Sequence, residues 1–261
     1  MEIRDILLLS LFVFLANGVE ALSGFGGVVI AVILGAIFFP IDSFLLPILV
    51  PVNFLVVLYI IARHHKKIDY KALFRDIMPF VFIGFLLGFG FKLYIRSKNT
   101  QVDWLTLLYG SFIVVFSTYQ LIKMIKNRGA EVVTKPMKLP ESAFWLGAGG
   151  IIYGIYASGG PLITIYANRR LSDKSVFRST LSALWLLLSG VLIAGDVIGG
   201  KINVESVKYS VAVLPALFAG IAAGEALHSR IKESTFRLVV FILLFIAGAG
   251  VLFQKFLALY R

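Results

Sequence analysis

The sequence predicts an all-α polytopic membrane protein, built from two inverted-topology repeats of about five helical segments each. Three observations lead to this prediction. First, 59% of the 261 residues are hydrophobic and 15% are charged, with a mean hydropathy of +0.92, and this composition does not fit a soluble domain. Second, apolar segments recur along the whole chain. Third, two glycine-rich breaks interrupt them at matching places in the two halves.

Ten apolar segments fill nearly the whole chain, at 5–22, 28–39, 44–62, 77–95, 104–125, 142–157, 161–168, 178–199, 207–228 and 235–259. A bilayer crossing takes about 20 apolar residues. Segments 28–39 and 161–168 are shorter, so we expect broken or re-entrant short helices there. The expected organisation is a first transmembrane repeat at 1–128, a cytoplasmic linker at 129–141 and a second transmembrane repeat at 142–261.

Basic residues are concentrated in a few loops. Lysine and arginine outnumber aspartate and glutamate by 25 to 14, and the loops at 63–76, 123–141, 169–178 and 229–237 hold 17 of these 25. Such loops mark the cytoplasmic side of a membrane and contact lipid headgroups. We therefore expect a multi-pass protein of the cytoplasmic membrane with both termini outside. The expected partner of the net charge of +11 is the lipid bilayer, not nucleic acid.

The two halves share a further motif, which reads Pro79, Phe82, Gly84 and Gly88 in the first and Pro215, Phe218, Gly220 and Gly224 in the second. Each half has five segments, an odd number, so the second copy enters the membrane from the opposite side, as in inverted-repeat transporters. The four glycines are expected to be scaffold, because small residues spaced by four let helices pack closely.

The two breaks are the candidate substrate site. A helix that begins at a glycine-rich break presents unpaired N–H groups and the positive end of its dipole, which favour an anion, and paired breaks of this kind indicate a transporter's binding site. Pro161 suits the first position of a new helix. Close helix packing is the alternative explanation for both glycine runs. The candidate substrate-binding residues are Ser23, Gly24, Gly26, Gly27, Ser158, Gly159, Gly160, Thr164, Asn53 and Arg178.

Two carboxylates are candidates for proton coupling, because an ionisable group at membrane depth usually has a function. Glu20 lies four residues before the first break, and Glu225 directly follows Gly224. The alternatives are a structural, hydrogen-bonded carboxyl for Glu20 and an interfacial ion pair with His228 or Arg230 for Glu225.

Four other polar residues lie in or next to apolar segments. Three of them have two possible roles, and the fourth has one expected location. Asn17 and Asn53 lie in the middle of apolar segments, so each is expected either to line a cavity or to join helices. Arg178 opens a segment near the second break, where it either draws an anion toward the cytoplasmic mouth or only sets the topology. Asp196 lies near a segment end and is expected at the membrane interface.

Two stretches resemble the signatures of a known transporter family. The first is 22–30, which reads LSGFGGVVI; the second comprises Gly149, Gly150, Gly154, Ser158-Gly159-Gly160-Pro161-Leu162, Tyr166 and 177–181, which reads FRSTL. Together they resemble the TauE/SafE sulfite exporter family, also called the 4-toluene sulfonate uptake permeases. The resemblance covers nearly the whole chain. It implies transport of a small anion, such as sulfite, a sulfonate or another sulfur compound, across the cytoplasmic membrane.

The function expected is that of a secondary permease for a small anion, working by alternating access, with proton coupling as an option. No cofactor or metal is expected: the chain has no cysteine, and adjacent His64 and His65 do not converge on one ion. An anion channel is the alternative, since broken helices also line pores. An intramembrane serine hydrolase with Ser158 and His228 is a weaker one, because Tyr156 stands where a glycine is expected. We therefore do not expect an enzyme.

Overall fold

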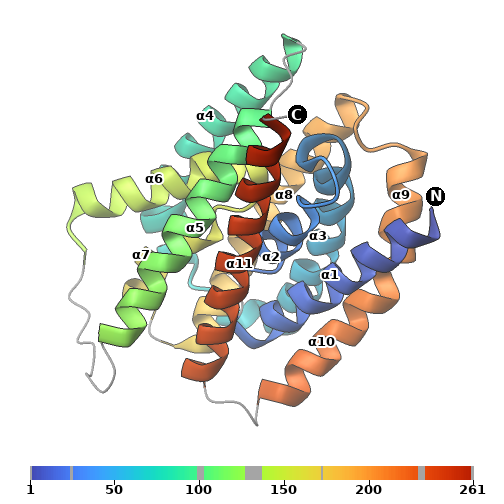
Figure 1. Ribbon diagram of the computed structural model, residues 1–261. Helices are drawn as coiled ribbons and strands as arrows, with labels where there is room; N and C mark the ends of the chain where they lie inside the picture. Colours follow the sequence, from blue (N-terminus) through green and yellow to red (C-terminus); the bar gives the residue numbers. More distant parts are fainter. Residues whose placement is uncertain are drawn as a thin grey trace.

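The computed structural model describes residues 2–23, 26–98, 103–126, 137–171, 173–228 and 233–259, and the regular structure in these ranges is helical throughout (Figure 1). The helices of the first half are α1 (Ile3–Ser23), α2 (Gly27–Gly35), η1 (Ile41–Leu45), α3 (Leu46–His64), η2 (His65–Lys67), η3 (Ala72–Ile77), α4 (Met78–Ser97) and α5 (Asp103–Lys126). Those of the second half are α6 (Leu139–Tyr156), α7 (Gly160–Arg170), α8 (Lys174–Ile198), α9 (Val204–Ala212), α10 (Leu214–His228) and α11 (Glu233–Leu259). The linker expected at 129–141 lies largely outside the described residues.

Within the described residues, five helical stretches are long and apolar enough to cross a membrane, namely Ile41–Lys67, Ala72–Ser97, Trp104–Lys126, Ser175–Ile198 and Val204–Ala226. By contrast, α2 has nine residues and α7 has eleven. At about 1.5 Å per residue neither reaches across a hydrocarbon core of about 30 Å. The prediction of a polytopic helical protein with two short, broken helices is therefore confirmed.

The helix starts follow from local chemistry. Proline occupies the first turn of α3, α4, α6 and α7, where its missing N–H costs no hydrogen bond. The Asp173 side chain caps α8 by accepting from Val176 N at 2.8 Å. Asn203 and Ser206 form a reciprocal capping box at the start of α9, which satisfies two N–H groups that the helix itself leaves unpaired.

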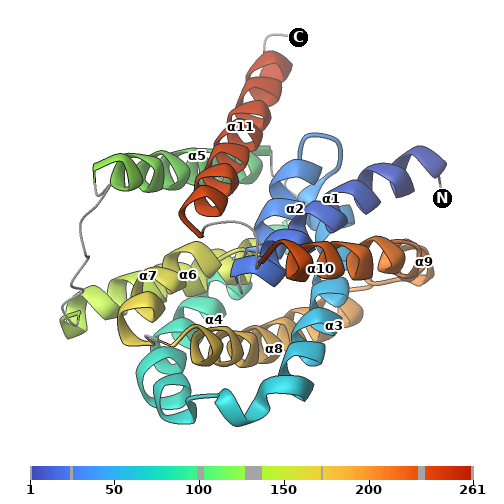
Figure 2. The same ribbon diagram turned by 90° about the horizontal axis from the view of Figure 1, so that it is seen from below.

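Helices of the first half pair with helices of the second half. The most extensive contacts are those of α4 with α6, α1 with α10, α5 with α11 and α3 with α8; Figure 1 shows α1 beside α10, and Figure 2 shows the same pair from below. The short helix α2 packs against α1, α3 and α11, and most of its residues are buried. The start of α2 therefore lies inside the protein.

Glycines make two of these pairs close. A Cβ added at Gly88 of α4 would overlap the carbonyl oxygen of Ile151 on α6, and one at Gly224 of α10 would overlap that of Gly18 on α1. The two glycines one turn earlier, Gly84 and Gly220, face backbone carbonyls in the same way. The prediction that these four glycines allow close helix packing is confirmed.

A buried group of four charged side chains joins α4, α8 and η1. Arg96 of α4 donates from Nε to Oδ2 of Asp42 at 2.7 Å and from Nη1 to Oδ1 of Asp196 at 2.8 Å. The Lys92 Nζ lies 3.3 Å from Oδ1 of Asp42 and 3.8 Å from Oδ1 of Asp196. Two positive and two negative charges thus balance in a site where Lys92 and Asp196 are almost fully buried. The sequence pointed to an interfacial Asp196 but gave no sign of these partners.

Candidate functional site

The first break separates α1 from α2, and its described part begins at Gly26. Gly26 caps α2 with a backbone φ of 97°, a left-handed conformation that residues other than glycine rarely adopt. No atom of the described residues lies within 4 Å of a Cβ added there, so the backbone angle, not crowding, requires this glycine. Gly24 lies outside the described residues, and so does the side chain of Ser23.

The second break turns α6 into α7. Ala157 ends α6 with φ of 54°, and Gly160 and Pro161 open α7. Ser158 between them is buried, and its Oγ donates to the carbonyl of Tyr156 at 2.9 Å. Thr164 in the first turns of α7 is also buried, and its Oγ1 donates to the carbonyl of Pro161 at 2.9 Å.

The two glycines of the second break differ in their surroundings. A Cβ at Gly159 would overlap the carbonyl oxygen of Gly149, so close packing of α6 and α7 accounts for this glycine. A Cβ at Gly160 would meet only the edge of the Trp185 ring, at 3.7 Å, which is an ordinary contact. Packing therefore explains Gly159 and leaves Gly160 without a packing reason.

Glu20 turns back against the start of α2. Its side chain is 3% exposed, and its Oε2 lies where a Cβ of Gly27 would be. This oxygen has no hydrogen-bond partner among the described residues. Because α2 begins at Gly27, the carboxyl group sits at the positive end of the helix dipole.

Arg178 of α8 faces the same region. Its charge acts on the Glu20 carboxyl, although the two form no ion pair within 4.0 Å in the described part of the chain. The Arg178 Nε is buried and, like Glu20 Oε2, finds no hydrogen-bond partner among the described residues. A half-buried cation thus lies within electrostatic range of a buried acid, and the two form no direct ion pair among the described residues.

Aromatic side chains connect the two breaks. The Tyr109 hydroxyl of α5 donates to the carbonyl of Val29 on α2 at 3.5 Å, and its side chain lies close to Ser158. The Tyr109 ring also stacks on Tyr156, with 4.6 Å between ring centroids. One residue of α5 therefore touches α2 and the second break together.

A second aromatic contact reaches Glu20. Tyr153 of α6 stacks on Trp185 of α8, with ring centroids 5.2 Å apart and planes 5° from parallel, and lies close enough to interact electrostatically with the Glu20 carboxyl. Because Trp185 lies next to Gly160, this stack lies between the acid of the first half and the turn of the second. Tyr109, Tyr153 and Trp185 were not predicted as site residues, since aromatic residues within apolar segments usually indicate only packing.

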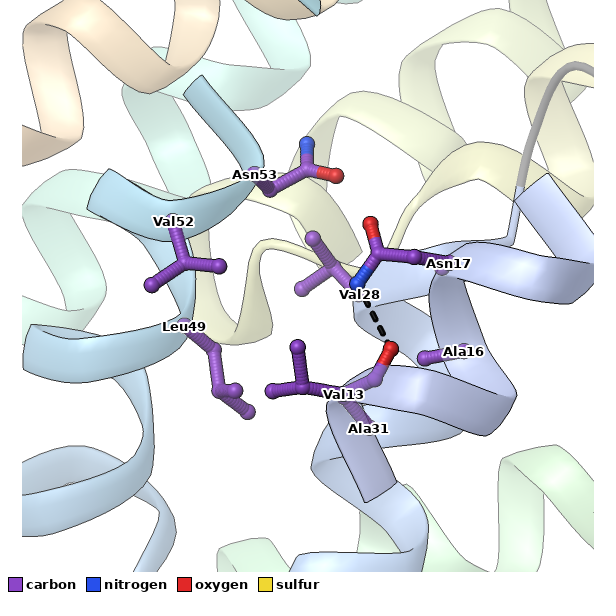
Figure 3. Close-up of a pocket in the computed structure, with 9 residues that line it drawn as sticks. Val13, Ala16, Asn17, Val28, Ala31, Leu49, Val52 and Asn53 are labelled. Atoms are coloured by element: carbon purple, nitrogen blue, oxygen red, sulfur yellow. Dashed lines mark hydrogen bonds between the residues drawn. The ribbon is translucent and has the colours of Figure 1, made fainter. Parts of the chain in front are cut away.

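Next to the first break lies a small cavity of about 10 Å³ (Figure 3). It is lined by Val13, Ala16, Asn17, Gly27, Val28, Ala31, Leu49, Val52 and Asn53. Its polar lining comes from the amides of Asn17 and Asn53, on α1 and α3; the Asn17 Nδ2 donates to the carbonyl of Val13 at 2.7 Å. Both amides thus line a cavity, which was one of the two alternatives. The volume suits about one water molecule and is too small for a polyatomic anion.

The second candidate for proton coupling lies away from this region, and the described residues form no metal site. Glu225 is exposed on α10, beside Gly224, which packs on α1. Within the described residues no group of three His, Asp or Glu side chains lies close enough together to hold a metal ion. The convergent polar groups are therefore those around Glu20, Arg178 and the two turns.

Comparisons with known proteins give one match. The model of the family "Sulfite exporter TauE/SafE" matches residues 9–251. A search of curated proteins and a search of solved structures each returned no match. The family match spans nearly the whole chain and includes both glycine-rich breaks and all the residues that meet around them. The chain therefore belongs to the sulfite exporter TauE/SafE family.

Proposed function

We propose that this protein is a secondary transporter that moves a small anion by alternating access. The anion class is sulfite, a sulfonate or another sulfur-containing anion, in keeping with the family. The proposal is carried by the position of the Glu20 carboxyl, which lies against the α2 start and within electrostatic range of Arg178, while Tyr109 links α2 to Tyr156 at the second break. Helix N-termini and guanidinium groups bind oxyanions through N–H donors, and the oxygens of sulfite and sulfonates accept such bonds.

Two inverted repeats are part of this proposal, and the helix contacts support them. If the two halves of the sequence are aligned so that Gly27 matches Gly160, then Gly18 matches Ile151. The carbonyl of Gly18 faces Gly224, and that of Ile151 faces Gly88. The contact of α1 with α10 is thus matched by that of α6 with α4. In the two other extensive pairs, α3 with α8 and α5 with α11, each helix meets its own counterpart. An approximate two-fold relation between the halves accounts for all four pairs.

The small volume of the cavity beside Gly27 supports the alternating-access part of the proposal. The cavity beside Gly27 holds about one water molecule, so an anion enters only after helices move apart. In the proposed topology α1 and α2 form a hairpin that enters from outside, and α6 and α7 form one that enters from the cytoplasm. Movement of one repeat against the other then opens the site to one side at a time.

The orientation proposed places the basic loops inside and both termini outside the cytoplasmic membrane. Arg169 and Arg170 at the end of α7 pair with Glu141 and Asp76, with N–O distances of 3.3 and 2.8 Å. These ion pairs lie at one end of the bundle, where α6 begins, α7 ends and η3 leads into α4. Basic residues gathered at one end of a helix bundle are the usual mark of its cytoplasmic face.

Gly160→Val tests the placement of the site. We expect purified variant protein to fold and insert normally, because a Cβ at this position makes an ordinary contact, but to lose anion uptake in liposomes, because the valine methyl groups cover the N–H groups of the α7 start. Gly90→Val is the matched control, since nothing lies within 4 Å of a Cβ there, and it should transport like the wild type. Normal flux through Gly160→Val would remove this turn from the site.

A further inference from the structure

We propose that the Glu20 carboxylate is an internal substitute for the transported anion: it occupies the start of α2 opposite Arg178, and protonation releases this place for the substrate. The inference rests on the proposed function and adds to it the means by which a proton and an anion are exchanged at one site. It is argued from where the carboxyl lies and from what surrounds it.

The position of the carboxyl is the first step. Oε2 of Glu20 fills the space in which a Gly27 side chain would begin, so it lies against the first residue of α2. The first N–H groups of a helix have no partner within the helix and attract negative charge. A substrate oxyanion that bound this helix start would need the volume that the carboxylate now holds. Both cannot occupy it as anions.

The surroundings of the carboxyl are the second step. The positive charge within electrostatic range of it belongs to Arg178 of α8, whose buried Nε has no hydrogen-bond partner among the described residues. From α6 the facing titratable group is Tyr153. On α10 the acid is Glu225, which is exposed, and on α9 Tyr209 accepts from Glu2 N at the opposite end of α1. Arg178 is thus the cation that the carboxylate and a substrate anion would share.

Charge balance is the third step. With Glu20 ionised, the pair of Glu20 and Arg178 is neutral; with an anion added, the same region carries an uncompensated negative charge, which is costly inside a membrane protein. A proton taken up by Glu20 from the solution on the open side removes one unit of this negative charge, which is the whole excess for a monovalent anion such as methanesulfonate, and lets the carboxyl rotate off the α2 start. One proton then enters with each anion, and both leave on the other side.

The sign of the pH effect follows directly. Protonation of Glu20 favours anion binding, so apparent affinity should rise as pH falls, and by linkage the binding of an anion should take up a proton. Above the pH at which the free protein loses the Glu20 proton, KM should rise by up to about tenfold per pH unit. Glutamine keeps the shape of the side chain and cannot ionise, so Glu20→Gln should bind the anion independently of pH.

The test measures KM for uptake by liposomes across a pH series, with thiosulfate or methanesulfonate as the probe, because the charge of neither changes over that series. Wild type and the matched control Glu225→Gln should show the pH-dependent KM. In Glu20→Gln the KM should stay low and vary by less than about twofold, and a proton gradient should no longer drive accumulation. A wild-type pH dependence in Glu20→Gln would overturn the inference while leaving the anion transporter intact.

A measurement on the wild type alone covers the case in which Glu20→Gln does not fold. Addition of the same anion to the detergent-solubilised protein in weak buffer should take up about one proton per anion bound, which a pH indicator reports. Binding without proton uptake would overturn the inference. Absence of any saturable flux of either anion through the wild type would instead refute the proposed function, and the inference with it.

Discussion

Replacing Asp196 with asparagine is expected to lower the free energy of unfolding by about 3–5 kcal/mol, because it leaves Lys92 and Arg96 with one carboxylate between them, that of the half-buried Asp42. The Lys92 ammonium is almost fully buried, and Asp42 is the other acid within 4.0 Å of it in the described part of the chain. The two cations would then share the single charge of Asp42, and an unbalanced charge beside the buried Lys92 is costly. Thermal and denaturant unfolding in detergent, followed by tryptophan fluorescence, measures the loss.

A paired variant separates charge balance from shape. Lys92→Met combined with Asp196→Asn restores neutrality, so most of the lost stability should return and the double variant should lie within about 1 kcal/mol of the wild type. Glu205→Gln, which removes an exposed acid at the start of α9, should change stability by less than about 0.5 kcal/mol. A double variant no more stable than Asp196→Asn would show that the four side chains do not act as a balanced group.

Gly88→Val should disrupt the pairing of α4 with α6. The added Cβ would overlap the carbonyl oxygen of Ile151, and a backbone atom of a facing helix cannot rotate away as a side chain can. Overpacking of this kind typically costs about 1–3 kcal/mol and sometimes more; we expect the upper part of that range or loss of the folded protein. Size-exclusion chromatography and thermal unfolding in detergent report both outcomes.

Gly90→Val is the control on the same helix, since nothing lies within 4 Å of a Cβ there. It should keep the stability of the wild type within about 0.5 kcal/mol. If Gly88→Val were equally stable, close approach would not be the reason for glycine at this position, and the proposed match with Gly224 would lose its basis. Equal damage from both variants would instead indicate that valine harms α4 itself.

The helical membrane fold was predictable because its signals are local. Composition and segment length indicate a polytopic protein, and glycine-rich runs indicate where α1 and α6 must stop. Gly84 and Gly88 were assigned to helix packing from their spacing, and the structure confirms this assignment. The same pattern does not tell which helix each glycine meets, because that depends on contacts between distant parts of the chain.

The candidate site was predictable only in part, for the same reason. The sequence position of Glu20, close to the first break, predicted a buried side chain, and the side chain is indeed buried. Its contact with Gly27 could not be predicted, because it arises only where α2 packs against α1. Tyr109 was missed because its partner on α2 is a backbone carbonyl, which leaves no trace in the side-chain pattern. The ion pairs of Asp196 were missed because charges at segment ends normally face water or headgroups.

The most direct test of the central claim is the uptake of radiolabelled sulfite by liposomes that contain the purified wild-type protein. An alternating-access carrier predicts uptake that saturates with sulfite concentration, that small sulfonates or thiosulfate inhibit, and that sulfite loaded inside the liposomes accelerates by exchange. Uptake that rises linearly with concentration and shows no exchange would indicate a channel. No uptake of sulfite, thiosulfate or small sulfonates above that of empty liposomes would contradict an anion transporter of this class.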